Sequence, residues 1–146
     1  MAMDGIGTPR LEVLWLEDDD DFFDNAAALL RKGAAAIPPG VGLRFRPSIR
    51  RAVTLHDALA DLSHNPDLVV VDLNLPDSRG VDTVMTLRRA VPGTPMLILT
   101  VVEDIEPAML VAVEGAEFLD KDDLSPARLV RAAYMAIMRA SAPPLP

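Results

Sequence analysis

The sequence predicts a three-layer α/β domain built around a parallel sheet of about five strands. Three short apolar runs, each closed by a polar residue, are typical of strands buried on both faces of such a sheet: Leu11–Leu16, Leu68–Val71 and Met96–Leu99. Segments with the spacing of amphipathic helices alternate with them, over Phe22–Lys32, Leu55–Ser63, Val81–Ala90, Pro107–Glu114 and Pro126–Arg139. The alternation favours right-handed βαβ units, with a further short strand at Glu117–Asp120.

The segment between Gly33 and Ala52 has the least regular pattern of the predicted domain. A loop rich in proline and glycine precedes the alternating residues Leu43–Arg46, which predict a second strand. Pro47 has no backbone N–H to donate, so we expect this strand at an edge of the sheet. Whether Ile49–Val53 belongs to it is left open, and its position is fixed only within 41–53.

Residues that favour helix starts precede three of the predicted helices. Thr54 stands before one helix, and Asp77 or Ser78 before another. Ser125 followed by Pro126 reads as an N-cap with proline at the first helical position.

The two ends of the chain carry glycine and proline without a periodic apolar pattern. We therefore expect flexible tails over 1–10 and 141–146, on either side of one domain over 11–140. Because so few residues follow the last predicted helix, we expect this domain to stand alone.

Composition excludes several classes of function. The 146 residues include 22 acidic and 14 basic side chains, and the net charge of −8 would repel nucleic acid and anionic membranes. The chain has no cysteine and only two histidines, which excludes disulfides, thiolate metal sites and a histidine-rich metal cage. No apolar stretch approaches the roughly 20 residues needed to cross a bilayer, so we expect a cytoplasmic protein.

Polar side chains follow the predicted strands where each strand ends. They are Glu17 and Asp18, Asp72, Thr100 and Lys121. Ligands of open α/β sheets bind beyond the carboxyl ends of the strands, so these side chains should share one site. Three carboxylates there repel one another unless a cation lies among them, and a set of oxygen ligands suits Mg²⁺. A hydroxyl and an ammonium beside them would suit a phosphoryl group, with Asp72 as its acceptor.

The ordered set of motifs resembles the receiver domains of two-component response regulators, over about Leu11–Arg139. The motifs are, in chain order, an apolar strand ending in Glu17-Asp18, the run Asp67-Leu-Val-Val-Val-Asp72-Leu-Asn-Leu-Pro76 with Gly80 after it, Thr94-Pro-Met-Leu-Ile-Leu-Thr100, and Gly115-Ala116 before Phe118-Leu-Asp-Lys121. The resemblance implies a flavodoxin-like (βα)5 fold with strand order 2-1-3-4-5.

The resemblance also implies roles for the strand-end residues. Asp72 would be the phosphoacceptor, and Lys121 would contact the phosphoryl group. Asp18 and Asp72 would bind Mg²⁺ directly, together with the main-chain carbonyl of Asn74, and Glu17 would act through water. The protein would be a signalling switch, not a turnover enzyme. It would receive its phosphoryl group from a sensor histidine kinase or a histidine phosphotransfer protein.

Thr100 and Phe118 would form the switch pair of such a domain. The output surface would then be the face made by the helices Pro107–Glu114 and Pro126–Arg139 and the strand between them. Both helices carry more apolar residues than one buried stripe requires. We therefore expect some of them, chosen among Met109, Val113 and Met138, to dock a downstream protein or a second copy in a homodimer.

Three features depart from the family pattern. Val101 stands where the family usually has alanine or glycine, the spacing from Gly115 to Phe118 is one residue shorter than usual, and Asp122 replaces a frequent proline. Val101 could narrow access to the acyl phosphate.

Two alternative functions compete with the signalling switch. One alternative function is a receiver-like adaptor that binds its partner regardless of phosphorylation. A second is an aspartyl-phosphate hydrolase, but that chemistry wants a general acid two residues after the nucleophile, where this chain has Asn74. A cluster of arginines is interpreted as a solvated sheet edge, with docking of an acidic partner as its alternative: Arg44, Arg46, Arg50 and Arg51.

Overall fold

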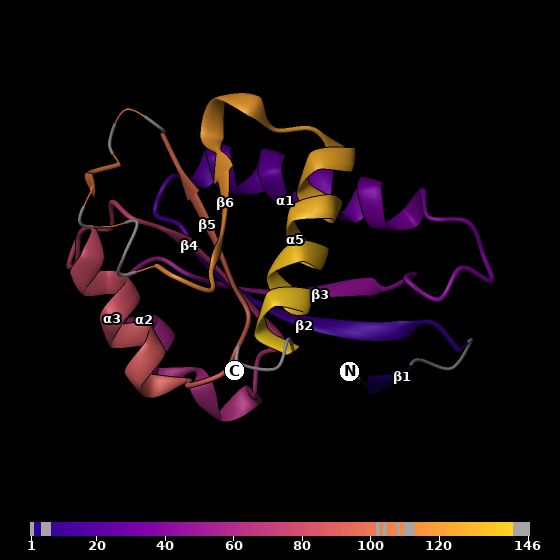
Figure 1. Cartoon of the computed structure of the whole chain (residues 1–146), viewed down its shortest axis with the longest axis horizontal. Helices are drawn as coiled ribbons and strands as arrows, with labels where there is room; N and C mark the ends of the chain where they lie inside the picture. The colour runs from indigo at the N-terminus through magenta and orange to yellow at the C-terminus, as the bar shows by residue number, and fades with distance from the viewer. Residues whose placement is uncertain are drawn as a thin grey trace.

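The computed structural model describes residues 2–3, 7–101, 103, 105–107, 109 and 113–141, and it has the predicted α/β architecture (Figure 1). The five parallel strands are β2 (Pro9–Leu16), β3 (Arg46–Ala52), β4 (Leu68–Asp72), β5 (Met96–Thr100) and β6 (Glu117–Asp120). Their order across the sheet is β3-β2-β4-β5-β6. In chain order this is 2-1-3-4-5, which confirms the expected topology.

Helices cover both faces of the sheet. The helices α1 (Asp20–Ala35) and α5 (Pro126–Ser141) pack on one face, and α2 (Leu55–Ala60), the short helix η1 (Leu62–His64) and α3 (Val81–Ala90) pack on the other. Of the helix expected over Pro107–Glu114, residues 107 and 109 are helical, 113–115 form a turn, and 108 and 110–112 lie outside the described residues. None of the described helices is long and apolar enough to cross a bilayer.

The sheet divides the core into two layers, as the inner strand β2 shows. Leu11, Val13 and Trp15 pack against α1 and α5, whereas Leu14 and Leu16 pack on the opposite face, as the period of two in a strand requires. All five are almost completely buried. Burial of each side chain contributes about 1.5–3 kcal/mol, so these strands fix the sheet to which the polar strand ends are attached.

The second parallel strand spans Arg46–Ala52, inside the range 41–53 within which the sequence left its position open. It begins at the last of the alternating residues Leu43–Arg46 and includes Ile49, which pairs with Val13 of β2. The edge position is confirmed, because β3 pairs with β2 alone among the described strands. An edge strand needs hydrogen bonds along one side only, so the missing N–H of Pro47 is tolerated.

Part of the expected N-terminal tail belongs to the sheet. Pro9 and Arg10 open β2, and the two-residue strand β1 (Ala2–Met3) pairs with them in antiparallel orientation. At the other end, α5 extends through Ser141, and the remaining residues of the expected C-terminal tail lie outside the described part of the chain.

Two of the three predicted helix caps are present. Thr54 Oγ1 accepts a hydrogen bond from the N–H of Asp57, and Ser125 Oγ accepts one from Arg128. The prediction for α3 is wrong, because Gly80 is its cap residue and caps without a side chain. Asp77 instead accepts hydrogen bonds from the first backbone N–H groups of α2, which ties the β4–α3 loop to that helix.

Candidate functional site

The predicted site residues meet at the carboxyl edge of the sheet. Glu17 and Asp18 directly follow β2, Asp72 ends β4, Thr100 ends β5 and Lys121 directly follows β6. Because these strands are parallel and adjacent, their ends bring the five side chains to one place. The hydrophobic runs that precede them therefore position the site.

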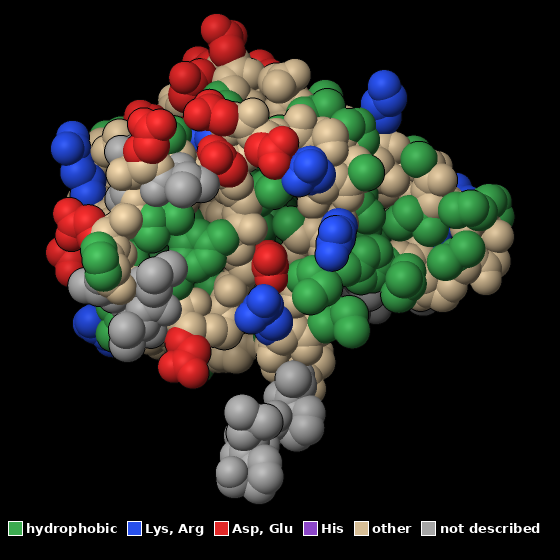
Figure 2. All heavy atoms as spheres, turned by 45° about the horizontal axis from the view of Figure 1, so that its top comes forward, with side chains coloured by type: hydrophobic (Ala, Val, Ile, Leu, Met, Phe, Trp, Pro, Cys, Tyr) green, Lys and Arg blue, Asp and Glu red, His purple; other side chains and the backbone are tan. Residues whose placement is uncertain are grey.

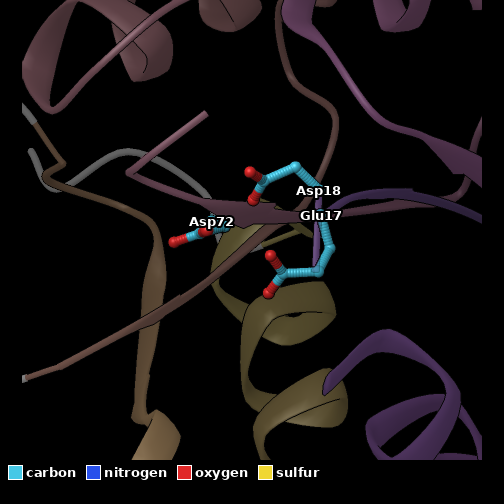
Figure 3. Close-up of side chains that lie close together, drawn as sticks. All are labelled: Glu17, Asp18 and Asp72. Carbon is cyan, nitrogen blue, oxygen red and sulfur yellow. The ribbon is translucent and has the colours of Figure 1, made fainter. Parts of the chain in front are cut away.

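Three carboxylates converge there (Figure 3). Glu17, Asp18 and Asp72 each offer an oxygen, and these oxygens all lie within 4.8 Å of one another. Glu17 and Asp72 are buried, whereas Asp18 is exposed. Like charges this close repel strongly, so the cluster needs positive charge beside it.

Lys121 supplies positive charge to the cluster. Its Nζ donates a hydrogen bond to Glu17 Oε1 at 2.8 Å and lies 3.2 Å from Asp72 Oδ2. The same ammonium lies 4.3 Å from the centre of the Phe22 ring on α1, which favours a cation on its face. Burial opposes the charged ammonium, but the hydrogen bond to Glu17 and the charges of Asp72 and Glu17 raise the pKa of Lys121.

Glu17 is the most deeply buried acid of the cluster, with only 1% of its surface exposed. Its Oε2 accepts a hydrogen bond from the N–H of Asp19. Burial raises the pKa of Glu17 from 4.5 to about 7, and the charge of Asp72 adds to the rise, against the opposing effect of Lys121. The negative charges of Glu17 and Asp72 therefore repel each other in the site, and Lys121 offsets part of that repulsion.

A cleft of about 550 Å³ opens beside Asp72. Thr100 and Lys121 line it together with Asn74, whose N–H donates to Asp72 Oδ1 at 3.2 Å. The hydroxyl of Thr100 makes one long hydrogen bond, 3.4 Å to the carbonyl of Val101. The cleft therefore offers an ammonium and a lightly engaged hydroxyl to a group attached at Asp72. Its other described lining residues include Val101, Arg79, Asp82 and Glu106.

Phe118 lies on β6, one strand away from Asp72. It is half-buried and packs against the core cluster that contains Met109 and Val113. Phe118 pairs in register with Ile98, two residues before Thr100. Both members of the predicted switch pair thus lie on neighbouring strands, with Thr100 on the cleft and Phe118 outside its lining.

Arg51, interpreted from the sequence as part of a solvated sheet edge, belongs to the site. Its Nε donates to the carbonyl of Glu17 at 3.0 Å, and its guanidinium stacks 4.9 Å from the Phe23 ring. One terminal nitrogen lies 2.7 Å from Asp20 Oδ1, an ion pair whose angles fall outside hydrogen-bond geometry. Arg51 thus holds both ends of the acidic loop after β2. A strand predicted over 46–52 would have placed Arg51 near its carboxyl end, on the side of the sheet where the site lies.

The donor set of the cluster fits a hard divalent cation. Its described ligands are carboxylate oxygens, with no nitrogen or sulfur donor among them, and such ligands suit Mg²⁺. The exposed position of Asp18 leaves one side open to solvent, and Mg²⁺ characteristically keeps several waters.

Comparison with known proteins agrees with the geometry. The family model of the response regulator receiver domain matches residues 44–134, a range that includes Asp72, Thr100 and Lys121. The luminescence regulatory protein LuxO of Vibrio campbellii is 32% identical over 65 residues, which cover 44% of this chain and 14% of LuxO. The cell cycle transcriptional regulator CtrA of Caulobacter vibrioides is 41% identical over 51 residues, which cover 35% of this chain and 22% of CtrA.

The matches thus span less than a quarter of the length of these curated relatives. Among solved structures, a response regulator receiver domain protein from Clostridium thermocellum has a TM-score of 0.69 at 24% identity, covering 90% of this chain and 97% of that one. A putative response regulator from Chloroflexus aurantiacus has a TM-score of 0.67 at 26% identity, covering 88% and 98%. The family model matches more than half of the sequence, so the chain belongs to the response regulator receiver domains.

Proposed function

We propose that this receiver domain is a phosphoryl-accepting switch and that Asp72 is its acceptor. The observation that carries the proposal is the position of the Asp72 carboxylate, which opens onto a cleft shared with Thr100 and Lys121 and lies within 4.8 Å of two further acids. The donor would be a sensor histidine kinase or a histidine phosphotransfer protein, and we place the exchange in the cytoplasm.

In the transfer step, an oxygen of Asp72 attacks the phosphorus of a phosphohistidine. The new O–P bond forms as the P–N bond breaks, and the imidazole leaves with the electron pair of that bond. Lys121 neutralises charge on the transferred oxygens, and the Thr100 hydroxyl donates a hydrogen bond to one of them. Both groups line the cleft beside Asp72.

Asp18, Asp72 and the main-chain carbonyl of Asn74 would hold Mg²⁺, with Glu17 acting through water. When bound, Mg²⁺ offsets the charge of the phosphoryl group against the acids of the site. Lys121 contacts both Glu17 and Asp72, the acids that would face the metal and the phosphoryl group. We therefore expect metal and phosphoryl group together to change the partners of Lys121.

We further propose that Thr100 and Phe118 report the modification to the face formed by 107–114, β6 and α5. The docking residues expected there need correction. Met109 and Val113 are 4% and 2% exposed, so neither presents a side chain to a partner. Met138 is 62% exposed, but it lines a groove that α5 shares with α1. The output surface must therefore use other residues of this face.

The direct test is to incubate the protein with Mg²⁺ and a small phosphodonor and to measure the intact mass. We expect one added phosphoryl group on the wild type and none on Asp72→Asn. Asp82→Asn is the matched control, because Asp82 is an exposed acid that lines the same cleft. EDTA should abolish the label. Equal labelling of Asp72→Asn, or labelling unchanged by EDTA, would overturn the assignment.

A further inference from the structure

An apolar groove lies on the side of the molecule that α1 and α5 share, away from the cleft at Asp72. It has a volume of about 640 Å³, and Arg131 is the one charged side chain in its described lining. The floor depends on Gly33, because a Cβ at this position would lie 2.3 Å from the carbonyl oxygen of Pro126. Glycine therefore lets α1 and α5 approach closely at the base of the groove.

The groove exposes several large apolar side chains. Four of the six exposed large hydrophobic residues of the described chain line it: Val41 at 42%, Leu43 at 56%, Met135 at 37% and Met138 at 62%. Scattered exposed hydrophobics are ordinary, but several that line one concave surface mark an interaction site. Figure 2 shows hydrophobic side chains gathered on this part of the surface.

Charge is segregated around the groove. Between Asp24 and Asp57 the sequence has six basic residues and no acid, and after Asp123 it has three basic residues and no acid. These two segments supply all the lining residues. At least four of their nine basic side chains form ion pairs with acids, namely Arg50, Arg51, Arg128 and Arg139. The positive charge at the groove therefore comes from Arg131 in its lining and from residues beside the lining. Lys32 and Arg44 are sequence neighbours of the lining residues Gly33 and Leu43. In Figure 2 the acidic side chains gather mainly elsewhere, toward the upper left.

The concave apolar surface and the basic residues beside it favour one kind of binding partner in the groove. A second copy bound groove to groove would bring two basic borders together, which like-charge repulsion opposes. A bilayer presents a broad surface, whereas a concave groove fits a ridge of side chains. An amphipathic helix supplies such a ridge. The α5 part of the groove, from Pro126 to Met138, is about 20 Å long, enough for nearly four helical turns.

We propose that this groove docks an amphipathic helix of a protein partner, with an apolar stripe between α5 and residues 37–43 and acidic side chains toward Arg131 and the neighbouring basic residues. The proposal does not rest on phosphoryl transfer, because no residue of the acidic cluster lines the groove. It also revises our interpretation of the cluster of arginines over 44–51. Arg50 and Arg51 are engaged within the protein, whereas Arg44 lies beside the groove.

The test uses a designed helical peptide with leucines on one stripe and glutamates elsewhere, and a twin with lysine in place of every glutamate. Binding is measured by fluorescence anisotropy. Methyl signals of labelled methionines locate the contact, because Met135 and Met138 line the groove whereas Met85 is an exposed methionine on α3. Leu43→Glu, Met138→Glu and Arg131→Glu test the groove. Met85→Glu and Arg89→Glu are the matched controls.

We expect the glutamate peptide to shift Met135 and Met138 but not Met85. Leu43→Glu, Met138→Glu and Arg131→Glu should each weaken binding at least about tenfold, and the controls less than about twofold. The lysine twin should bind at least about tenfold more weakly. No binding of the glutamate peptide, or equal binding of the twin, would overturn the proposal.

Two further measurements separate the other occupants. One outcome is that the wild type binds vesicles of phosphatidylcholine and phosphatidylglycerol while Met138→Glu does not, and that the peptide binds neither protein. That result would show that the groove contacts a membrane. If light scattering shows a dimer that Leu43→Glu dissociates, the occupant is a second copy. Either result overturns the proposal.

Discussion

Helix α1 connects two regions of opposite character, about 24 Å apart along its axis. At its amino end, buried acids crowd around one ammonium in a polar cleft. Its carboxyl end borders an apolar groove. The two chain segments that line this groove contain basic residues but no acidic ones. The first region buries charge and the second exposes apolar surface. Both cost stability without building the core, which is how functional surfaces differ from the rest of a fold.

The lysines of the chain test this contrast most strongly, because Lys121 lies in the cleft and Lys32 near the groove. Lys121→Ala leaves Glu17 and Asp72 without their cation. We expect phosphorylation to slow by roughly 100-fold and unfolding at pH 8 to become easier by about 2–3 kcal/mol. The stability loss should shrink at pH 5, where Glu17 is protonated. Lys32→Ala should change neither quantity, as urea denaturation and intact-mass kinetics can show.

Glu17 should make the cleft sensitive to pH. Its pKa in the folded protein, about 7, is above its ordinary value of 4.5. The folded state thus binds this proton more tightly, so its contribution to stability is full below pH 4.5 and is lost as pH rises through 7. We expect a loss on the order of 2 kcal/mol between pH 4.5 and 8 in EDTA. Urea denaturation should show that Glu17→Gln flattens this dependence while Glu12→Gln keeps it.

The neighbouring residues Arg51 and Arg50 allow a positioning residue to be compared with a residue of a surface ion pair. Arg51 holds the loop of Glu17 and Asp20, whereas Arg50 pairs with Asp61 at the surface. We expect Arg51→Ala to cost about 1–1.5 kcal/mol and to weaken Mg²⁺ binding several-fold, and Arg51→Lys to restore part of that binding. Arg50→Ala should change the free energy of unfolding little, because solvent screens an exposed ion pair, and it should leave Mg²⁺ binding unchanged. Fluorescence of Trp15, the one tryptophan, provides the titration signal.

The smallest effect is expected at the groove. Met138→Glu places a charge on a side chain that is already 62% exposed, so the free energy of unfolding should change by less than about 0.5 kcal/mol. Phosphorylation at Asp72 should keep its wild-type rate, because the groove and the cleft share no lining residue. A slower rate in the intact-mass assay would mean that the two regions are coupled and that their separation is wrong.

The sequence predicted the cleft well and the groove poorly, for a physical reason. Buried parallel strands are continuous apolar runs, so the polar residues that close them, such as Asp72 and Thr100, can be read directly. The edge strand β3 has no such run, and Pro47 obscured it, so the place of Arg51 in the site was missed. Helical spacing shows that α5 has more apolar residues than one buried stripe requires. It does not show which neighbouring element each of these residues faces. Met138 was therefore assigned to the wrong face.

The central claim is that Asp72 carries the phosphoryl group, and its most direct test locates the modification chemically. Borohydride reduces an aspartyl phosphate to homoserine, which peptide mass mapping then finds at one position. After incubation with Mg²⁺ and a phosphodonor, we predict homoserine at position 72 in the wild type and at no position in Asp72→Asn. Homoserine at another aspartate, or a label that borohydride does not reduce, would contradict the account.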